Sequence, residues 1–149
     1  MKRLAVNKLL NLVVCLLLSG LVLGQSAKVV TGARANGTYR YRGSEIRMLA
    51  LGHNKLRVQL DLIYEYKSRY GPMANIGWAT GEATIENDTA IFHPLYFPEC
   101  TIAIKFLAGN KIKVTQDHDA AECGFGHHVF ADGTYAKVKA GKPKFEVIR

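Results

Sequence analysis

The segment 117–128 holds the densest group of side chains that could do chemistry. Three acids and three histidines lie within it, namely Asp117, His118, Asp119, Glu122, His127 and His128. Carboxylates and imidazoles are common metal ligands, so a metal-dependent hydrolase using the three histidines is one hypothesis. The spacing matches no established metal motif, and adjacent His127 and His128 would point to opposite faces of an extended chain. The pattern favours a polar loop with solvated histidines.

Elsewhere the residue types predict no catalytic site. Downstream of residue 24 the chain has only Ser26, Ser44 and Ser68, and none lies in a nucleophile elbow. No helix is expected after Gly124-Phe125-Gly126, so these glycines do not suit a phosphate loop. Two glycines around an aromatic residue indicate a tight bend instead. We expect no catalytic residue, no cofactor and no enzymatic activity.

Two expected loops are unusually aromatic. One runs from Tyr64 to Met73 and also carries basic residues, and the other is the proline-bounded segment 93–98. Their ligand-binding candidates are Tyr64, Tyr66, Tyr70, Tyr96 and Phe97. If both loops lie at one end of a barrel, they form a mouth suited to a small hydrophobic or anionic ligand. The alternative is that these side chains plug the barrel end.

The elements that must position these residues are strands. Between 55 and 66, one face carries Leu56, Val58, Leu60, Leu62, Tyr64 and Tyr66, and polar residues dominate the other. A period of two over twelve residues predicts a strand. The segments 100–107 and 111–116 alternate in the same way around Ala108-Gly109-Asn110, which predicts a hairpin.

Weaker alternation predicts further strands, and no stretch of ten residues has a helical stripe. These strands are 38–42 with 45–51, 78–86 with 89–93, and one or two more within 129–138. About eight strands in a meander predict a small antiparallel all-β barrel over residues 37–149, with a β-sandwich as the alternative. The similar segments Gly37-Thr38-Tyr39 and Gly133-Thr134-Tyr135 favour closure, because two such strands would make natural edge partners.

The amino-terminal residues predict export. Basic residues precede an apolar run from Leu9 to Leu23, and Val22 and Gly24 suit a signal peptidase. Residues 1–24 are therefore a predicted signal peptide, and the apolar run is too short to favour a permanent membrane anchor. Residues 25–36 are small and polar, which indicates a flexible leader. Cleavage would remove Cys15.

The two remaining cysteines, Cys100 and Cys123, then predict one disulfide. This bond would hold the polar segment 117–122 against the base of the 100–116 hairpin and stabilise the fold by about 3 kcal/mol.

Charge and composition restrict the partners only weakly. Removing residues 1–24 takes away three of the 20 Lys and Arg and none of the 12 Asp and Glu, which leaves a net charge of +5. Basic and aromatic residues interleave over 34–47, but an exported protein meets little nucleic acid, so no nucleic-acid partner is expected. The basic carboxy-terminal residues from Lys137 are expected to form a solvated tail.

The carboxy-terminal half resembles small exported bacterial β-barrel proteins of largely unassigned function. The resemblance covers about forty residues, through the strands at 100–106 and 111–116, Cys123-Gly124-Phe125-Gly126 and Ala131-Asp132-Gly133-Thr134-Tyr135. It implies an exported barrel and no catalytic residue. More distantly the chain is similar to the calycins, which include lipocalins, although Tyr39 stands where their Gly-x-Trp signature has tryptophan. Periplasmic lysozyme inhibitors are similar in size, but a basic chain would repel a basic lysozyme unless acids cluster in one loop.

We therefore expect an exported, non-enzymatic binding protein of the periplasm or cell exterior. Its ligand would be small and hydrophobic or anionic, or part of the envelope. One alternative is an inhibitor or interaction module acting through residues 117–128. The other is the metal-dependent hydrolase.

Overall fold

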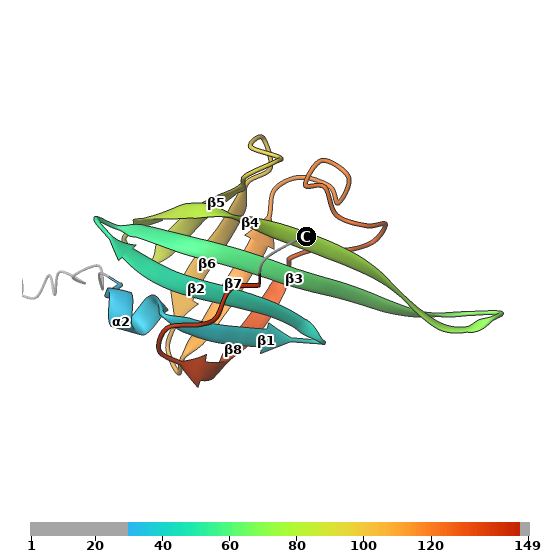
Figure 1. Ribbon diagram of the computed structural model, residues 1–149, viewed down its shortest axis with the longest axis horizontal. Helices are drawn as coiled ribbons and strands as arrows, with labels where there is room; N and C mark the ends of the chain where they lie inside the picture. The colour runs from blue at the N-terminus through green and yellow to red at the C-terminus, as the bar shows by residue number, and fades with distance from the viewer. Residues whose placement is uncertain (1–29, 147–149) are drawn as a thin grey trace, which may run out of the picture.

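The computed structural model describes residues 30–146 of the 149-residue chain. Eight antiparallel strands close into one barrel in which neighbours in sequence are neighbours in the sheet. Pairing of the last strand with the first completes the ring (Figure 1). The elements are α2 Gly32–Ala35, β1 Gly37–Tyr41, β2 Ser44–Gly52, β3 Lys55–Ser68, β4 Gly71–Glu86, β5 Thr89–Pro94, β6 Ile102–Leu107, β7 Lys111–Gln116 and β8 Gly133–Ala140.

The closed meander confirms the predicted all-β barrel, and the sandwich alternative is wrong. The hairpins formed by β1 and β2, by β4 and β5, and by β6 and β7 turn where the sequence placed them. Residues 129–132 were expected within a strand, but β8 begins only at Gly133. Residues 129–132 do not form a strand because the chain is still turning there: the Val129 N–H donates to the Gly126 carbonyl oxygen.

Side chains of the wall fill the barrel interior. Alternate residues face inward, as the period of two requires. The largest fully buried apolar side chains are Tyr39, Tyr135, Phe92, Ile46, Met48, Leu56, Leu60, Ile102, Ile104, Ile112 and Val58. An eight-stranded barrel is just wide enough for side chains to fill it. Each such side chain stabilises the fold by about 1.5–3 kcal/mol, so packing of the interior is the main source of stability.

The hairpin of β3 and β4 is much longer than its neighbours. β2 pairs with β3 only as far as Asp61, and β5 pairs with β4 only from Gly81. Residues 62–77, named here the arm, therefore continue as a two-stranded ribbon that projects past the barrel (Figure 1). The expectation of a loop from Tyr64 to Met73 is wrong. Cross-strand pairing continues to Ser68 and Gly71, and only two residues form the turn. β4 accordingly begins at Gly71, before the predicted residue 78.

Two matching sequence units flank the seam where the barrel closes. They are Ala35-Asn36-Gly37-Thr38-Tyr39 and Ala131-Asp132-Gly133-Thr134-Tyr135. In each unit the buried tyrosine hydroxyl donates to the carbonyl oxygen of the alanine four residues earlier, at 3.0 Å. β1 and β8 are antiparallel, so the two units lie at opposite ends of the barrel. The predicted pairing of the first strand with the last is confirmed.

Residues 30–36 differ from the expected flexible leader. Thr31 caps the short helix α2, whose Ala35 is fully buried, and Val30 is buried beside it. The Val30 N–H donates to the Asn87 carbonyl oxygen at the end of β4, so this segment closes one end of the barrel. Lys137 of β8 reaches across and donates to the Asn36 carbonyl oxygen. The apolar contacts of Val30 and Ala35 hold the segment in place. No sequence periodicity predicts these contacts, because they involve two single residues.

The carboxy-terminal segment 141–146 is also attached and is not a wholly solvated tail. It crosses the outside of β2 and β3 (Figure 1). The Gln59 side chain of β3 alternates with the inward-facing residues, yet it is only 1% exposed. The Gln59 amide donates to the Glu146 carbonyl oxygen and accepts from the Glu146 N–H, both at 3.0 Å. Arg47 forms ion pairs with Glu45, Asp61 and Glu146 around this contact. Burial raises the pKa of Asp61, while the Arg47 charge opposes that rise.

The expected signal peptide, residues 1–24, and the expectation of no permanent anchor concern a part of the chain outside the described residues. The first five residues of the expected leader, 25–29, also lie outside them. Between residues 30 and 146, no helix combines the length and the apolar character needed to cross a membrane.

Alkaline pH should unfold this barrel through Tyr39 and Tyr135. Burial raises the pKa of both hydroxyls above the ordinary value. Above about pH 10 the unfolded chain loses these protons and the folded barrel keeps them, so stability falls as pH rises. Each tyrosine should contribute a slope of about 1.4 kcal/mol per pH unit, measured by urea unfolding at stepped pH. In the double variant Tyr39→Phe, Tyr135→Phe the free energy of unfolding should vary less above that pH; an unchanged slope would contradict the assignment.

Candidate functional site at the aromatic end of the barrel

Four connections meet at one end of the barrel because the strands alternate in direction. They are the turn 42–43, the arm, the loop 95–101 and the loop 117–132. Ten large hydrophobic side chains are exposed within residues 30–146, and only Leu51 and Val138 lie away from this end. The other eight are Tyr64, Tyr70, Met73, Ile76, Leu95, Tyr96, Phe97 and Phe130. We call this the aromatic end.

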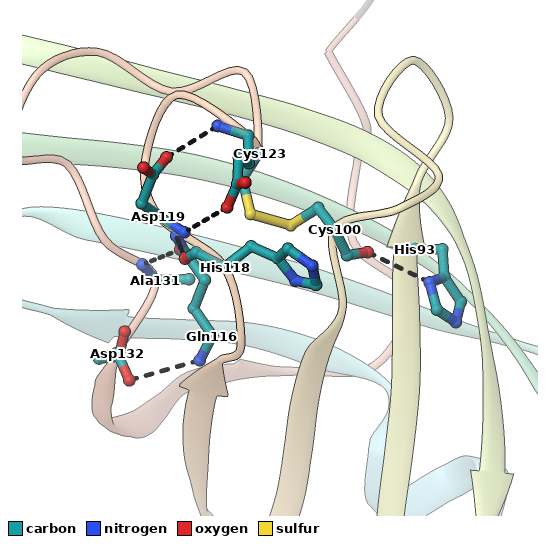
Figure 2. The surroundings of a disulfide bond; sticks show 9 residues. His93, Cys100, Gln116, His118, Asp119, Cys123, Ala131 and Asp132 are labelled. Atoms are coloured by element: carbon teal, nitrogen blue, oxygen red, sulfur yellow. Dashed lines mark hydrogen bonds between the residues drawn. A yellow bond between two sulfur atoms is a disulfide. The ribbon is translucent and has the colours of Figure 1, made fainter.

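The loop 117–132 is fastened at its start by the predicted disulfide. Cys100 and Cys123 are bonded (Figure 2). The Asp117 N–H donates to the Thr101 carbonyl oxygen, which extends the β6–β7 pairing by one step. Asp119 and Glu122 each accept a hydrogen bond from the other's backbone N–H. The predicted attachment of 117–122 to the base of the hairpin is confirmed. These acids are therefore used to shape the loop.

Gly124-Phe125-Gly126 fastens the middle of the same loop to two neighbours. Gly124 has a φ of +72°, and a Cβ there would lie 2.1 Å from the Phe97 ring. The Gly126 N–H donates to the Ile76 carbonyl oxygen of the arm at 3.0 Å. Phe125, 7% exposed, is buried between these contacts. The tight bend predicted here is the point where the loop, the arm and the segment 95–101 meet.

A row of four aromatic rings runs from the arm into this loop. Tyr66 stacks on Tyr64 with ring centres 6.0 Å apart, and Tyr64 lies 5.6 Å from the His128 ring. The rings of His128 and His127 are 3.9 Å apart. Asn75 of the arm donates to the His127 carbonyl oxygen at 2.7 Å and so fixes the junction. We call these four side chains the ring row.

The expectation that His127 and His128 point apart is wrong. His128 has a φ of +59°, in the left-handed region that histidine enters only occasionally. This turn brings the two imidazoles together and directs them toward Tyr64. The turn therefore places the His128 ring in contact with the arm.

Two small surface hollows meet at Tyr64 and His128 of the ring row. One, of about 220 Å³, is lined by Tyr64, Tyr66, Asn75 and both histidines. The other, of about 240 Å³, shares Tyr64 and His128 and includes Arg42, Phe130 and Asp132. Each is smaller than the roughly 300–1,000 Å³ typical of a drug-sized ligand pocket. Their size suits a single ring, a sugar unit or a protruding side chain, held partly in the open.

The five candidate ligand residues are brought to one end but not into one site. Tyr64 and Tyr66 belong to the ring row, whereas Tyr70 lies at the arm's tip, 82% exposed, under the Arg69 guanidinium. Tyr96 is 72% exposed in the loop 95–101, and Phe97 packs over Gly124. The predicted single mouth is therefore a wider surface. The sequence did not predict that the tyrosine rings of the arm contact His127 and His128. This contact depends on the left-handed turn at His128, which no sequence pattern indicated.

The three histidines do not form a metal site together. Within residues 30–146, no group of three or more His, Cys, Asp or Glu side chains is placed to hold a metal ion. His118 lies beside the disulfide, as Figure 2 shows, and its buried Nδ1 has no protein hydrogen-bond partner. His127 and His128 lie instead against Tyr64. The described residues therefore offer the hydrolase hypothesis no three-ligand centre.

Gly77 should be essential for seating the loop 117–132 on the arm. A Cβ at Gly77 would lie 2.8 Å from Val129 and 2.9 Å from Phe125. We expect Gly77→Ala to displace both side chains and lower the free energy of unfolding by about 1–3 kcal/mol, measured by urea denaturation. The matched control is Ala74→Val on the same strand, where the side chain is exposed and a change within about 0.5 kcal/mol is expected. Equal effects would argue against this contact.

Comparison with known proteins adds no relative to this description. No family model, no curated protein and no solved structure matches the chain. The resemblances to small exported barrel proteins and to calycins therefore remain expectations from the sequence. Function must be inferred from the barrel, the disulfide-fastened loop and the ring row themselves.

Proposed function

We propose that this protein is an exported, non-enzymatic binding protein whose ligand binds outside the barrel, along the ring row at the aromatic end. The observation that carries the proposal is the gathering of exposed hydrophobic side chains there, eight of ten within residues 30–146. Contiguous exposed apolar patches commonly mark interaction sites, because they cost solubility and are otherwise rare. The signal-peptide features and the disulfide support export.

The packed interior is the reason for an external site. Phe92, Met48 and Tyr135 are among the side chains that occupy the space in which a lipocalin would hold its ligand. A ligand would have to displace well-packed side chains to enter, at a cost of several kcal/mol. The hollows beside Tyr64 and His128 are already open and need no such change.

The chemistry of the ring row suits a small hydrophobic group that carries an anion. Aromatic faces contribute apolar contact at little loss of side-chain freedom. Arg42 lies over the Tyr41 ring at 5.3 Å and lines the hollow that His128 also lines. Its guanidinium and the imidazole N–H groups are donors for a carboxylate or phosphate. We therefore place the proposed ligand among envelope components that expose a ring or sugar with such a group.

The Tyr64→Ala variant should lose the ligand. Native mass spectrometry of protein purified from its own host is expected to show a bound species on the wild type and a loss of at least about tenfold in occupancy without the Tyr64 ring, which joins both hollows. The matched control is Leu51→Ala, because Leu51 is 42% exposed against 41% for Tyr64 but lies at the opposite end. A ligand-free wild type, or equal loss in both variants, would contradict the proposal.

A second candidate function is an inhibitor or interaction module acting through residues 117–128. The observation that favours it is the rigidity of this loop, which is fastened by Cys123, by the Asp119–Glu122 hydrogen bonds and by Gly126. A loop held in one conformation loses little entropy when it binds a protein surface. Glu99, Asp117 and Asp132 add negative charge near it, which suits a basic partner.

Removing the disulfide should distinguish the two proposed functions, because it should weaken protein capture more than binding of a small ligand. In the double variant Cys100→Ser, Cys123→Ser the loop 117–128 becomes free to move, and capture of a protein partner from an envelope extract should fall by at least about tenfold. Occupancy of a small ligand should fall less, because Tyr64 and Tyr66 belong to the arm. Equal capture by the wild type and the variant would count against a loop mechanism. Circular dichroism of the variant must show a folded barrel.

A further inference from the structure

The arm has two edges, and only one of them is protected. Successive residues of a strand point their N–H and C=O groups to opposite edges. On β4 the outward-pointing groups include Ile76, whose carbonyl oxygen accepts from Gly126, and Pro72, which has no N–H to offer. These are ordinary ways in which proteins block an edge strand. The β4 edge of the arm is therefore closed to another strand.

The β3 edge of the arm has neither of these two blocks. The Ile63 N–H donates to the Ser44 side chain on the β2 side, so the backbone groups of Glu65 and Lys67 point the same way. β2 pairs no further along β3 than Asp61. Residues 64–68 contain no proline, and their strand pairing with β4 is unbroken. This stretch presents unpaired donors and acceptors as a template for another strand.

We propose that residues 64–68 pair, antiparallel and edge to edge, with the same residues of a second copy of this chain, in a two-fold dimer centred on Tyr66. An isologous interface of this kind opposes residues equally spaced about the axis. Tyr66 then faces Tyr66 of the second copy, and Glu65 faces Lys67. The arms of the two copies form one four-stranded sheet. This proposal goes beyond the proposed function and stands without it.

The charges of Glu65 and Lys67 favour the register centred on Tyr66 over the nearest alternative registers. Because outward-pointing residues must meet outward-pointing residues, the nearest alternative registers are centred on Glu65 or on Lys67. Centring on Glu65 opposes two glutamates, and centring on Lys67 opposes two lysines, which destabilises a cross-strand pair. Centring on Tyr66 forms two Glu65–Lys67 pairs and uses the whole free edge. Both side chains are exposed, so nothing in the described chain competes for them.

The dimer would also unite the two ring rows. Tyr64 and Tyr66 lie on the face of the arm that continues the barrel's inward-facing positions, and Glu65 and Lys67 lie on the other face. Pairing about Tyr66 sets the two Tyr66 rings beside each other. The charge pairs and the aromatic side chains therefore occupy opposite faces of the sheet, which allows the dimer to be tested without touching the ring row.

Charge reversal tests the dimer directly. Sedimentation velocity of the mature protein over a dilution series should show a monomer–dimer equilibrium. Glu65→Lys and Lys67→Glu should each weaken it by about tenfold or more, since each replaces two attractive pairs with two repulsive ones. Mixing the two variants should restore dimer as a heterodimer, in which every opposed pair is again lysine with glutamate. Unchanged circular dichroism confirms that each variant is folded.

Cross-linking tests the position of the axis. Tyr66→Cys should form an intermolecular disulfide on mild oxidation, because the opposed Cα atoms would lie about 4.5 Å apart. The matched control is Ile76→Cys on β4, which at 71% is more exposed than the half-buried Tyr66 but lies on the protected edge and should not cross-link. A wild type that stays monomeric at every concentration, or a dimer that neither charge variant weakens, would overturn the proposal.

Discussion

Closure of the sheet between β1 and β8 is the constraint on which the rest of the structure depends. The seam joins the two ends of the chain's strand order, so no strand of the barrel proper is left with an open edge. Tyr39 and Tyr135 stand beside it, each hydrogen-bonded to the alanine carbonyl of its own Ala-x-Gly-Thr-Tyr unit. In the chain, each of these units directly follows a segment that covers one end of the barrel. A single local arrangement, used twice, thus joins the wall to both of its covers.

Closure also decides where binding can occur. A barrel of eight strands has room for its own side chains, and here Phe92, Met48 and their neighbours take it up. The outer wall is mostly polar, with Arg47 at the centre of an ion network under the carboxy-terminal segment. Eight of the ten exposed large hydrophobic side chains within residues 30–146 lie at the aromatic end. The proposed binding site and the proposed dimer edge both lie there because the arm continues beyond the point at which the barrel ends.

The disulfide and the Gly-Phe-Gly segment act together at that end. Cys123 fixes the beginning of the loop 117–132, and Gly124 and Gly126 allow it to approach Phe97 and Ile76 closely. Neither the disulfide nor the glycine contacts alone would hold the loop in one conformation. The disulfide leaves the residues after Cys123 free to move, and the glycines are too flexible without that covalent link. Together they hold His127 and His128 against the tyrosines of the arm. The loop that carries most of the potential chemistry is thereby made part of the fold.

Local sequence patterns were sufficient to predict most of the barrel wall. Strand alternation has a period of two wherever one face is buried, so β3, β6 and β7 could be predicted from residues 55–66 and 100–116. The Cys100–Cys123 pairing followed from assigning Cys15 to the predicted signal peptide. The length of the arm, the attachment of residues 30–36 and the contact of Tyr64 with His128 could not be predicted in this way. These depend on contacts between residues far apart in the chain, and on a left-handed turn at His128. Such contacts leave no local period, which is why the candidate residues were identified but their grouping was not.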